Sequence, residues 1–150
     1  MAQASTSSAA KIVVCPNCGK KNRLRSAGRG VAQCGSCHLP LPWLVEASES
    51  DFGLIVEQSS LPVLVEFWAP WCGPCRMVAP ALEAASVKHA GRLKVVKVNV
   101  DQSPNVAQRF GAMSIPLMVL VRDGSELDRL VGAVPAPQLE RWLSDRLVAA

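Results

Sequence analysis

The stretch "WAPWCGPCR", residues 68–76, places Cys72 and Cys75 in a C-x-x-C pair at the end of an apolar run. The run that leads into it, "PVLVEFWA", is rich in β-branched and aromatic residues, as in a buried strand. After the pair, Val78 and Leu82 are spaced as on one face of a helix. The sequence therefore predicts that a strand ends just before Cys72 and that a helix begins at that residue.

A cysteine at the start of a helix is activated, because unpaired backbone N–H groups and the helix dipole favour its thiolate. We expect Cys72 to be the exposed, attacking thiolate and Cys75, one turn inside, to be the more buried partner that resolves the mixed disulfide. Pro74 stiffens this turn, and Gly73 leaves the approach to Cys72 open. Trp71 is interpreted as part of the surrounding docking rim, with a core aromatic as the alternative.

The pattern around this motif alternates between strands and helices. Strands are expected at 43–47, 62–69, 93–100, 117–122 and 126–131, and helices at 50–59, from 72 onward, from 104 onward and at 136–147. Ser50 is expected to cap the first helix, and Asp123 with Gly124 to form a hairpin turn. A parallel portion followed by a hairpin and a last helix implies an α/β fold, with a mixed central sheet and helices on both faces.

Two further C-x-x-C pairs precede this region, in the pattern C-x2-C-x15-C-x2-C. Four thiolates at this spacing can close a tetrahedron around zinc, and a unit of about 45 residues with few large apolar side chains usually needs a metal or a disulfide to fold. We therefore predict a small zinc-ribbon-like domain that holds one structural zinc ion per chain. Its ligands are Cys15, Cys18, Cys34 and Cys37.

Two other interpretations of these four cysteines remain open. They can form two disulfides, which requires an oxidising compartment. The string "CGSCH" at 34–38 also matches a c-type haem attachment site with His38 as axial ligand, but that interpretation leaves Cys15 and Cys18 unexplained. We interpret His38 as a solvated neighbour of the site.

Charge separates the chain into two units. Six basic residues precede the first acidic residue, Glu46, whereas the rest of the chain has 10 basic and 12 acidic residues. Residues 1–43, which end in the linker "LPLPW", are predicted to form the zinc module, and residues 44–150 a second domain. The basic residues between the cysteine pairs are interpreted as solvated charge and not as nucleic-acid contacts. A transit peptide, acid-poor and Ser-rich, is the alternative for this region.

Composition indicates the compartment. No apolar run approaches the roughly 18 to 20 residues that span a bilayer, and the start "MAQASTSSAAK" contains no hydrophobic block of a secretory signal. We expect a soluble, cytoplasmic protein without membrane contact. In a reducing compartment, the six cysteines indicate metal binding and redox catalysis more than structural disulfides.

With these motifs, residues 44–150 resemble the thioredoxin family along their whole length. The resemblance rests on "VEFWAPWCGPCR", "VVKVNVDQSPNVAQRFGAMSIP" and the terminal "VGA…LERWL", which come in the family's order. It implies a thioredoxin fold and a protein-disulfide reductase whose dithiol, Cys72 and Cys75, binds no cofactor. It also implies that the NADPH-dependent flavoprotein thioredoxin reductase recharges the dithiol, and that the substrates are disulfide-containing proteins. We expect a monomer.

The resemblance also assigns roles outside the C-x-x-C motif. Ile115 and Pro116 match the family's cis-proline loop opposite the dithiol, which pairs with the substrate chain. Gly132 matches a glycine of the substrate-facing surface, and Lys97 the strand lysine near a buried acid. The ordinary alternatives are a trans peptide bond, a simple turn and a solvent-facing lysine. His89 has no match in the family and is expected at the surface.

Glu66 departs from the family pattern. Most thioredoxins have a buried aspartate at this position, which is thought to accept the proton of the resolving cysteine. The additional methylene of Glu66 brings its carboxyl nearer to the thiol or bends it aside. The alternative is a strand glutamate that faces water, but helices on both faces of the sheet favour burial.

Two functional hypotheses follow from these patterns. In the first, the chain is a redox enzyme that reduces protein disulfides through Cys72 and Cys75. In the second, the zinc ribbon is a binding module for nucleic acid or protein partners, and the thioredoxin domain acts as a scaffold.

Overall fold

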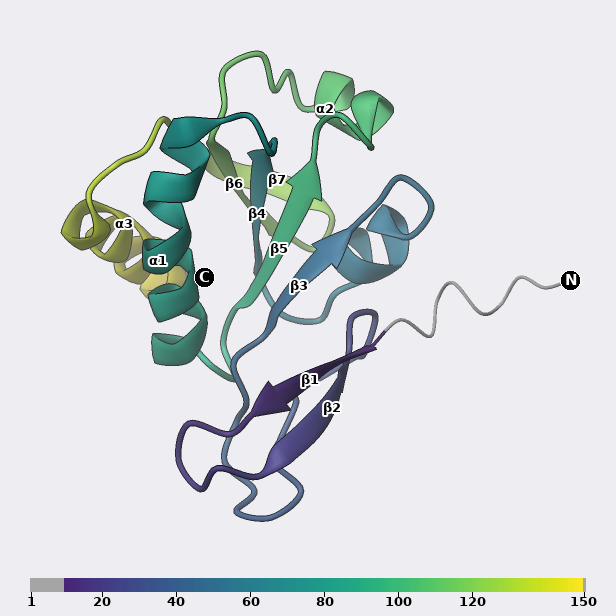
Figure 1. The fold of residues 1–150 in the computed structure, drawn as a ribbon, viewed down its shortest axis with the longest axis vertical. Coiled ribbons are helices and arrows are strands. Elements are labelled where there is room, and N and C mark those ends of the chain that lie inside the picture. The colour runs from purple at the N-terminus through teal and green to yellow at the C-terminus, as the bar shows by residue number, and fades with distance from the viewer. Residues whose placement is uncertain (1–9, 150) are drawn as a thin grey trace, which may run out of the picture.

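A computed structural model describes residues 10–149 of the chain (Figure 1). Five strands form one sheet in the order β3-β5-β4-β6-β7. Their bounds are β3 Leu44–Ala47, β4 Val63–Trp68, β5 Lys94–Asn99, β6 Leu117–Arg122 and β7 Ser125–Val131. β3, β5 and β4 run parallel, whereas β6 pairs antiparallel with both β4 and β7. The predicted α/β fold with a mixed central sheet is confirmed.

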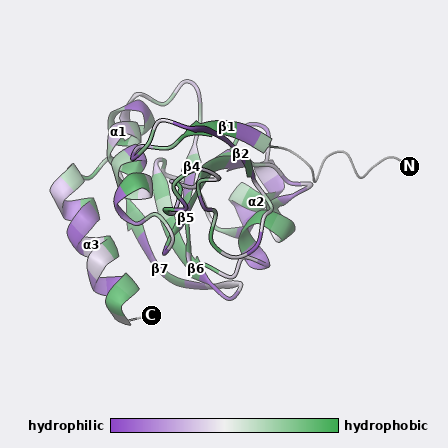
Figure 2. Cartoon of the chain, turned by 90° about the horizontal axis from the view of Figure 1, so that it is seen from below, coloured by the Kyte–Doolittle hydropathy of each residue, from purple (hydrophilic) through white to green (hydrophobic). Residues whose placement is uncertain are grey.

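Both faces of the sheet are covered by helices (Figure 1). α1 (Gly73–Lys88) and α3 (Ala136–Ala149) pack on one face, and α2 (Pro104–Arg109) and the π-helix η2 (Gly53–Glu57) pack on the other. α1 and α3 are striped green and purple in Figure 2, as expected for helices with one face in a core. Each strand of the sheet centre therefore contributes to two hydrophobic cores, which explains the continuous apolar run of β4.

The hairpin turn between β6 and β7 forms as expected. Asp123 and Gly124 both have positive φ angles, 51° and 79°, as a two-residue type I′ turn requires.

The segment before β4 differs from its prediction. A helix over 50–59 capped by Ser50 was expected, but η2 is one short π-helical turn whose N-terminus has no side-chain cap. The backbone N–H of Gln58 donates to the carbonyl of Gly53 at 2.9 Å, five residues back, which widens the turn. This widening leaves Leu54 exposed while Ile55 enters the core.

The N-terminal unit is a two-stranded hairpin, β1 (Ala10–Val14) and β2 (Lys21–Arg25), with two cysteine loops. It lies at the end of the sheet opposite the β4–α1 turn (Figure 1). The backbone N–H of Gly30 donates to Ser60 Oγ at 2.9 Å. Leu24 is buried in the core between the sheet and the helices η2 and α2. The unit is therefore packed against the second domain.

The segment "LPLPW", expected as a stiff linker, is itself part of this packing. Leu41 is buried beside Cys15 and Cys34, and Trp43 is buried in the core of the sheet domain. The ammonium of Lys94, itself buried, lies 4.3 Å from the centre of the Trp43 ring. The prolines of this segment thus stiffen a packed connection between the two units.

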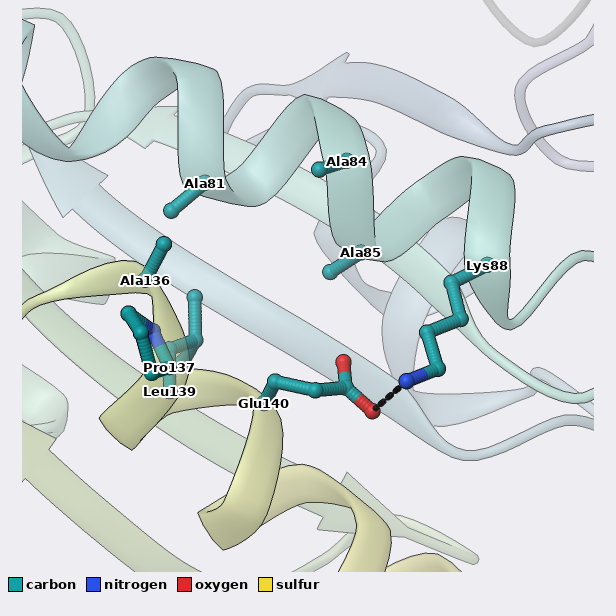
Figure 3. A pocket seen from close by; sticks show the side chains of 8 residues that line it. All are labelled: Ala81, Ala84, Ala85, Lys88, Ala136, Pro137, Leu139 and Glu140. Carbon is teal, nitrogen blue, oxygen red and sulfur yellow. Dashed lines mark ion pairs between the residues drawn. The ribbon is translucent and has the colours of Figure 1, made fainter.

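The prediction that His89 lies at the surface is wrong, because only 1% of this residue is exposed. His89 follows the last turn of α1, where its Nε2 donates to Glu140 of α3 at 3.0 Å and its Nδ1 accepts from Arg92 at 3.0 Å. Figure 3 shows the adjoining contact between α1 and α3, where small side chains line a hollow and Lys88 pairs with Glu140 at 3.0 Å. Glu140 on a distant helix and Arg92, three residues after His89, satisfy both ring nitrogens and make the burial of His89 favourable.

Candidate active site and metal centre

The C-x-x-C motif lies where β4 turns into α1. Cys72 is the N-cap of α1, with Pro74 in the first turn, and its Sγ accepts a hydrogen bond from the backbone N–H of Cys75 at 3.2 Å. Sequence analysis predicted this placement of a strand end and a helix start. Cys72 and Cys75 are joined by a disulfide, so the structure represents the oxidised protein. The helix N-terminus supplies the N–H groups that stabilise a thiolate at Cys72 after reduction.

The expected difference in exposure between the two cysteines is not present in this oxidised structure. Cys72 is 4% exposed and Cys75 is 3% exposed. The loop before β6 covers Cys72, whose Sγ lies 3.8 Å from the carbonyl oxygen of Ile115. What distinguishes the two sulfurs is position, since Cys72 caps the helix and Cys75 lies inside its first turn.

The residues expected to contact substrate gather around Cys72. Ile115–Pro116 is a cis peptide bond, and the backbone N–H of Gly132, with φ 94°, donates to the carbonyl of Pro116 at 2.8 Å. A Cβ added to Gly73 would meet no atom within 4 Å, so this side of the dithiol is open. Trp71 is 67% exposed, which rules out the core alternative.

Two other features of this surface were missed in the sequence. The indole N–H of Trp71 donates to Asp101 at 2.9 Å, which fixes the ring beside the dithiol. Met77, in the first turns of α1, and Met113, in the loop before the cis-proline, are 76% and 93% exposed. Exposed methionines are adaptable contact residues, but no local sequence signal marks them as exposed.

Glu66 is fully buried, so the water-facing alternative is wrong. Neither of its carboxylate oxygens has a hydrogen-bond partner among the described residues, and the nearest cation is Lys97, with Nζ 3.8 Å from Oε1. Desolvation raises the pKa of Glu66 from its ordinary value of 4.5 to about 7, although Lys97 lowers it and Glu46 adds to the rise. Glu66 lies on the α1 face of the sheet, since it alternates with Val65 and Phe67 of the opposite core. A carboxyl that titrates near neutral pH is suited to accept and release a proton.

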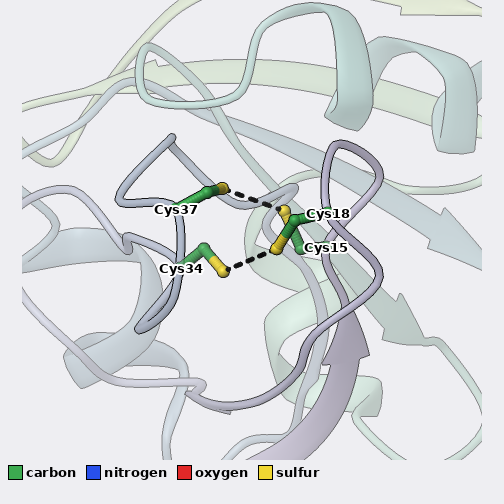
Figure 4. Close-up of side chains that lie close together, drawn as sticks. All are labelled: Cys15, Cys18, Cys34 and Cys37. Carbon is green, nitrogen blue, oxygen red and sulfur yellow. Dashed lines mark hydrogen bonds between the residues drawn. The ribbon is translucent and has the colours of Figure 1, made fainter.

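The four N-terminal cysteines form one cluster (Figure 4). Their sulfur atoms all lie within 4.8 Å of one another, with 3.6 Å between Cys15 and Cys37 and 3.5 Å between Cys18 and Cys34. A disulfide needs about 2.05 Å between sulfurs, whereas sulfurs at about 2.3 Å from a tetrahedral zinc ion lie ~3.8 Å apart. The donor set therefore fits zinc better than two disulfides. It also disfavours haem attachment, which would use only two of the four.

The surroundings of Cys34 and Cys37 lower their pKa and favour the thiolate, the form that binds metal. The backbone N–H of Lys20 lowers the pKa of Cys18, but hydrogen bonds to the other three thiols outweigh it and raise this pKa to about 11. The pKa of Cys34 is lowered to about 5, mainly by a hydrogen bond from the backbone N–H of Cys37. Burial of Cys34 raises its pKa, whereas the backbone N–H of Ser36 and the side-chain amide of Asn22 lower it further. Asn22 Nδ2 lies 3.5 Å from the Cys34 sulfur, and its Oδ1 accepts from the backbone N–H of Gly35 at 2.9 Å. In metal sites, hydrogen bonds from neighbouring groups hold the ligands in orientation, and these contacts of Asn22 do so for the loop that carries Cys34.

Comparison with known proteins agrees with this geometry. The family model described as "Thioredoxin" matches residues 43–145. "Thioredoxin 1" of Nostoc sp. is 46% identical over 102 residues, which cover 68% of this chain and 95% of the relative. "Thioredoxin" of Haemophilus influenzae is 38% identical over 104 residues, covering 69% of this chain and 97% of the relative.

Other relatives are matched over more of the chain. "Thioredoxin C-3" of Corynebacterium nephridii is 37% identical over 139 residues, covering 91% of this chain and 95% of the relative. Residues 43–150 are 108 of the 150 residues, so this match extends into the N-terminal unit.

A disulfide-forming C-x-x-C pair at the N-terminus of a helix, on a mixed sheet with a cis-proline loop beside it, defines a thiol–disulfide oxidoreductase. The chain belongs to the thioredoxin family. In residues 10–149, no helix is long and apolar enough to cross a bilayer.

Proposed function

We propose that the chain is a thioredoxin of the thioredoxin 2 type, a protein-disulfide reductase with a zinc module in front. In this proposal residues 1–43 form the zinc-binding module and linker, and residues 44–150 form the thioredoxin domain. The observation that carries the redox function is the disulfide between Cys72 and Cys75 beside the cis-proline loop. The zinc module is supported by the four-cysteine cluster.

Catalysis begins when the Cys72 thiolate of the reduced protein attacks one sulfur of a substrate disulfide. A mixed disulfide forms, and the other substrate sulfur leaves as a thiolate. Glu66 then accepts the proton of Cys75, and the Cys75 thiolate attacks Cys72 Sγ. The bond between Cys72 and the substrate breaks, both substrate thiolates take protons from solvent, and Glu66 returns its proton to solvent. Two electrons have passed to the substrate, and the chain is left as the Cys72–Cys75 disulfide.

Substrate binding is assigned to the surface around Cys72. Trp71, Gly73 and Pro74 form one side of it, and the backbone of Ile115, Pro116 and Gly132 forms the other. The exposure of the Trp71 ring and the open space above Gly73 support this assignment. Lys97 acts on the buried acid, which it approaches to 3.8 Å, and not on the substrate.

The metal is assigned to Cys15, Cys18, Cys34 and Cys37. Bound zinc supplies folding free energy to a unit whose own core is small, on the order of 10 kcal/mol for structural sites. The redox dithiol uses separate cysteines and needs no cofactor.

The partners follow from the family. Thioredoxin reductase recharges the dithiol with electrons from NADPH, disulfide-containing proteins are the substrates, and the chain works as a cytoplasmic monomer. The basic N-terminal unit is solvated charge in this proposal. The competing function, a zinc ribbon that binds nucleic acid or protein partners on a thioredoxin scaffold, is favoured only by the six basic residues that precede Glu46.

The test couples the chain to its proposed partners. With NADPH and a bacterial thioredoxin reductase, the intact chain should support continuous NADPH oxidation in the presence of insulin, and Cys72→Ser should not. Cys75→Ser should form mixed disulfides on Cys72 with substrate proteins, because resolution is blocked. The absence of both NADPH oxidation and mixed disulfides would contradict the proposed function and leave the binding-module hypothesis.

A further inference from the structure

Three charged side chains lie side by side across the parallel part of the sheet. The register pairs Glu46 of β3 with Lys97 of β5, and Lys97 with Glu66 of β4. All three lie on the α1 face of the sheet, where Glu66 is buried at the centre and Glu46 is exposed on the edge strand β3. The next residue in the row, Met118 of β6, is apolar. Lys97 is thus one cation between two carboxylates, of which one is buried without other partners.

The N-terminal unit reaches this row through Lys11 of β1. The ammonium of Lys11 donates to the carbonyl of Leu44 at 2.7 Å. Leu44 lies two residues before Glu46, so the side chains of these two residues share one face of β3. Lys11, Glu46 and Lys97 line one cavity together with Leu44 and Val45. A second cation from the other unit therefore faces the outer carboxylate of the row.

The charges of this row act on one another. Desolvation raises the pKa of Glu46, whereas Lys97 and Lys11 lower it. Glu46 in turn contributes to the raised pKa of Glu66, against Lys97. From α1, Glu83 lines the groove that Lys11 also lines. The ionisation of Glu66 therefore depends on how Lys97 is shared between the two carboxylates.

We propose that Glu46 and Lys11 are positioning residues that set the proton affinity of Glu66, and that they couple the N-terminal unit to this buried acid of β4. Glu46 draws Lys97 away from Glu66 and repels its carboxylate, so it keeps the proton on Glu66. Lys11 opposes this effect, since it neutralises Glu46 and leaves Lys97 to Glu66. The consequence for catalysis rests on the proposed function of Glu66 as the proton acceptor for Cys75.

The test measures the Glu66 pKa in the oxidised full-length protein with its metal. Carbon-13 NMR of labelled glutamate carboxyls follows the titration, and the Glu66 signal is identified by its loss in Glu66→Gln. We expect Glu46→Gln to lower the Glu66 pKa by about half to one pH unit, since the two carboxyls lie two strands, ~10 Å, apart. Lys11→Met should raise it. Lys21→Met removes the same charge from the far end of the hairpin and should leave the pKa unchanged.

Opposite shifts in Glu46→Gln and Lys11→Met, with no shift in Lys21→Met, support the coupling. An unchanged Glu66 pKa in Glu46→Gln, or an equal shift in Lys11→Met and Lys21→Met, overturns it. The pH profile of mixed-disulfide resolution should move in the same direction as the pKa in each variant. Because the NMR titration needs no substrate, opposite shifts in a chain that fails to reduce insulin would contradict the proposed function and leave the coupling intact.

Discussion

Replacing Glu66 with glutamine should stabilise the oxidised protein, and the gain should depend on pH. Glu66 is fully buried, and both of its oxygens lack hydrogen-bond partners among the described residues. A buried carboxylate in this state costs free energy whenever it is charged. Glutamine keeps the shape of the side chain and removes the charge.

The magnitude follows from the pKa of Glu66 in the two states. The folded protein holds a proton on Glu66 up to a pH of about 7, whereas the unfolded chain releases it near 4.5. The folded state therefore binds more protons between these values, so its stability falls as the pH rises through this window. At about 1.4 kcal/mol per pH unit, the penalty is absent below pH 4.5 and reaches ~3 kcal/mol above pH 7.

Urea unfolding of the oxidised protein at pH 5 and pH 8 measures this difference. Because small proteins lose about 1–3 kcal/mol of stability per molar urea, the midpoint of Glu66→Gln at pH 8 should lie ~1–3 M above that of the unaltered protein. At pH 5 the penalty is only ~0.7 kcal/mol, so the two midpoints should lie much closer together. Asp145→Asn, which replaces an exposed acid of α3, is the matched control and should leave the urea midpoint unchanged at both pH values. Equal midpoints of Glu66→Gln and the unaltered protein at pH 8 would refute the account of a desolvated, poorly paired acid.

Three other predictions concern separate parts of the chain. The alkylation rate of Cys72 in the reduced protein should rise with an apparent pKa below the thiol's ordinary value of about 8.5, and a rate that stays flat up to that pH would exclude activation by the helix N-terminus. Purified under reducing conditions, the chain should hold one zinc by elemental analysis, and Cys34→Ser should lose it while insulin reduction by the dithiol persists; retained metal would contradict the ligand set. His89→Ala should lower the free energy of unfolding by about 1–3 kcal/mol, since Glu140 and Arg92 lose a buried partner, and an unchanged urea midpoint would argue against that network.

The elements that the sequence predicts well are those with local signals. The apolar run of β4, the C-x-x-C pair after it and the helical spacing of Val78 and Leu82 all lie within about twenty residues, and the strand-to-helix turn forms where they predict it. The four-cysteine pattern likewise predicts a cluster, and in the structure each C-x-x-C pair sits in its own turn. Signals of this kind depend on backbone propensity and spacing, which a sequence displays directly.

The features that sequence analysis missed depend on contacts between distant segments. His89 is buried because Glu140, 51 residues later, supplies its partner. Cys72 is covered by the loop at Ile115, 43 residues away. The row of Glu46, Lys97 and Glu66 depends on the register of three parallel strands, which no local pattern specifies. Burial of Glu66 was predicted correctly because two covering helices leave little solvent at the sheet centre.

The central claim is that the Cys72–Cys75 dithiol reduces protein disulfides, and insulin reduction tests it most directly. With dithiothreitol as the electron source, the turbidity of precipitating insulin B chain is followed in the presence of the intact chain, of Cys72→Ser, and of the reductant alone. The account predicts that the intact chain shortens the lag and speeds precipitation in proportion to its concentration, while Cys72→Ser matches the reductant alone. Precipitation by the intact chain that is no faster than with dithiothreitol alone would contradict the claim.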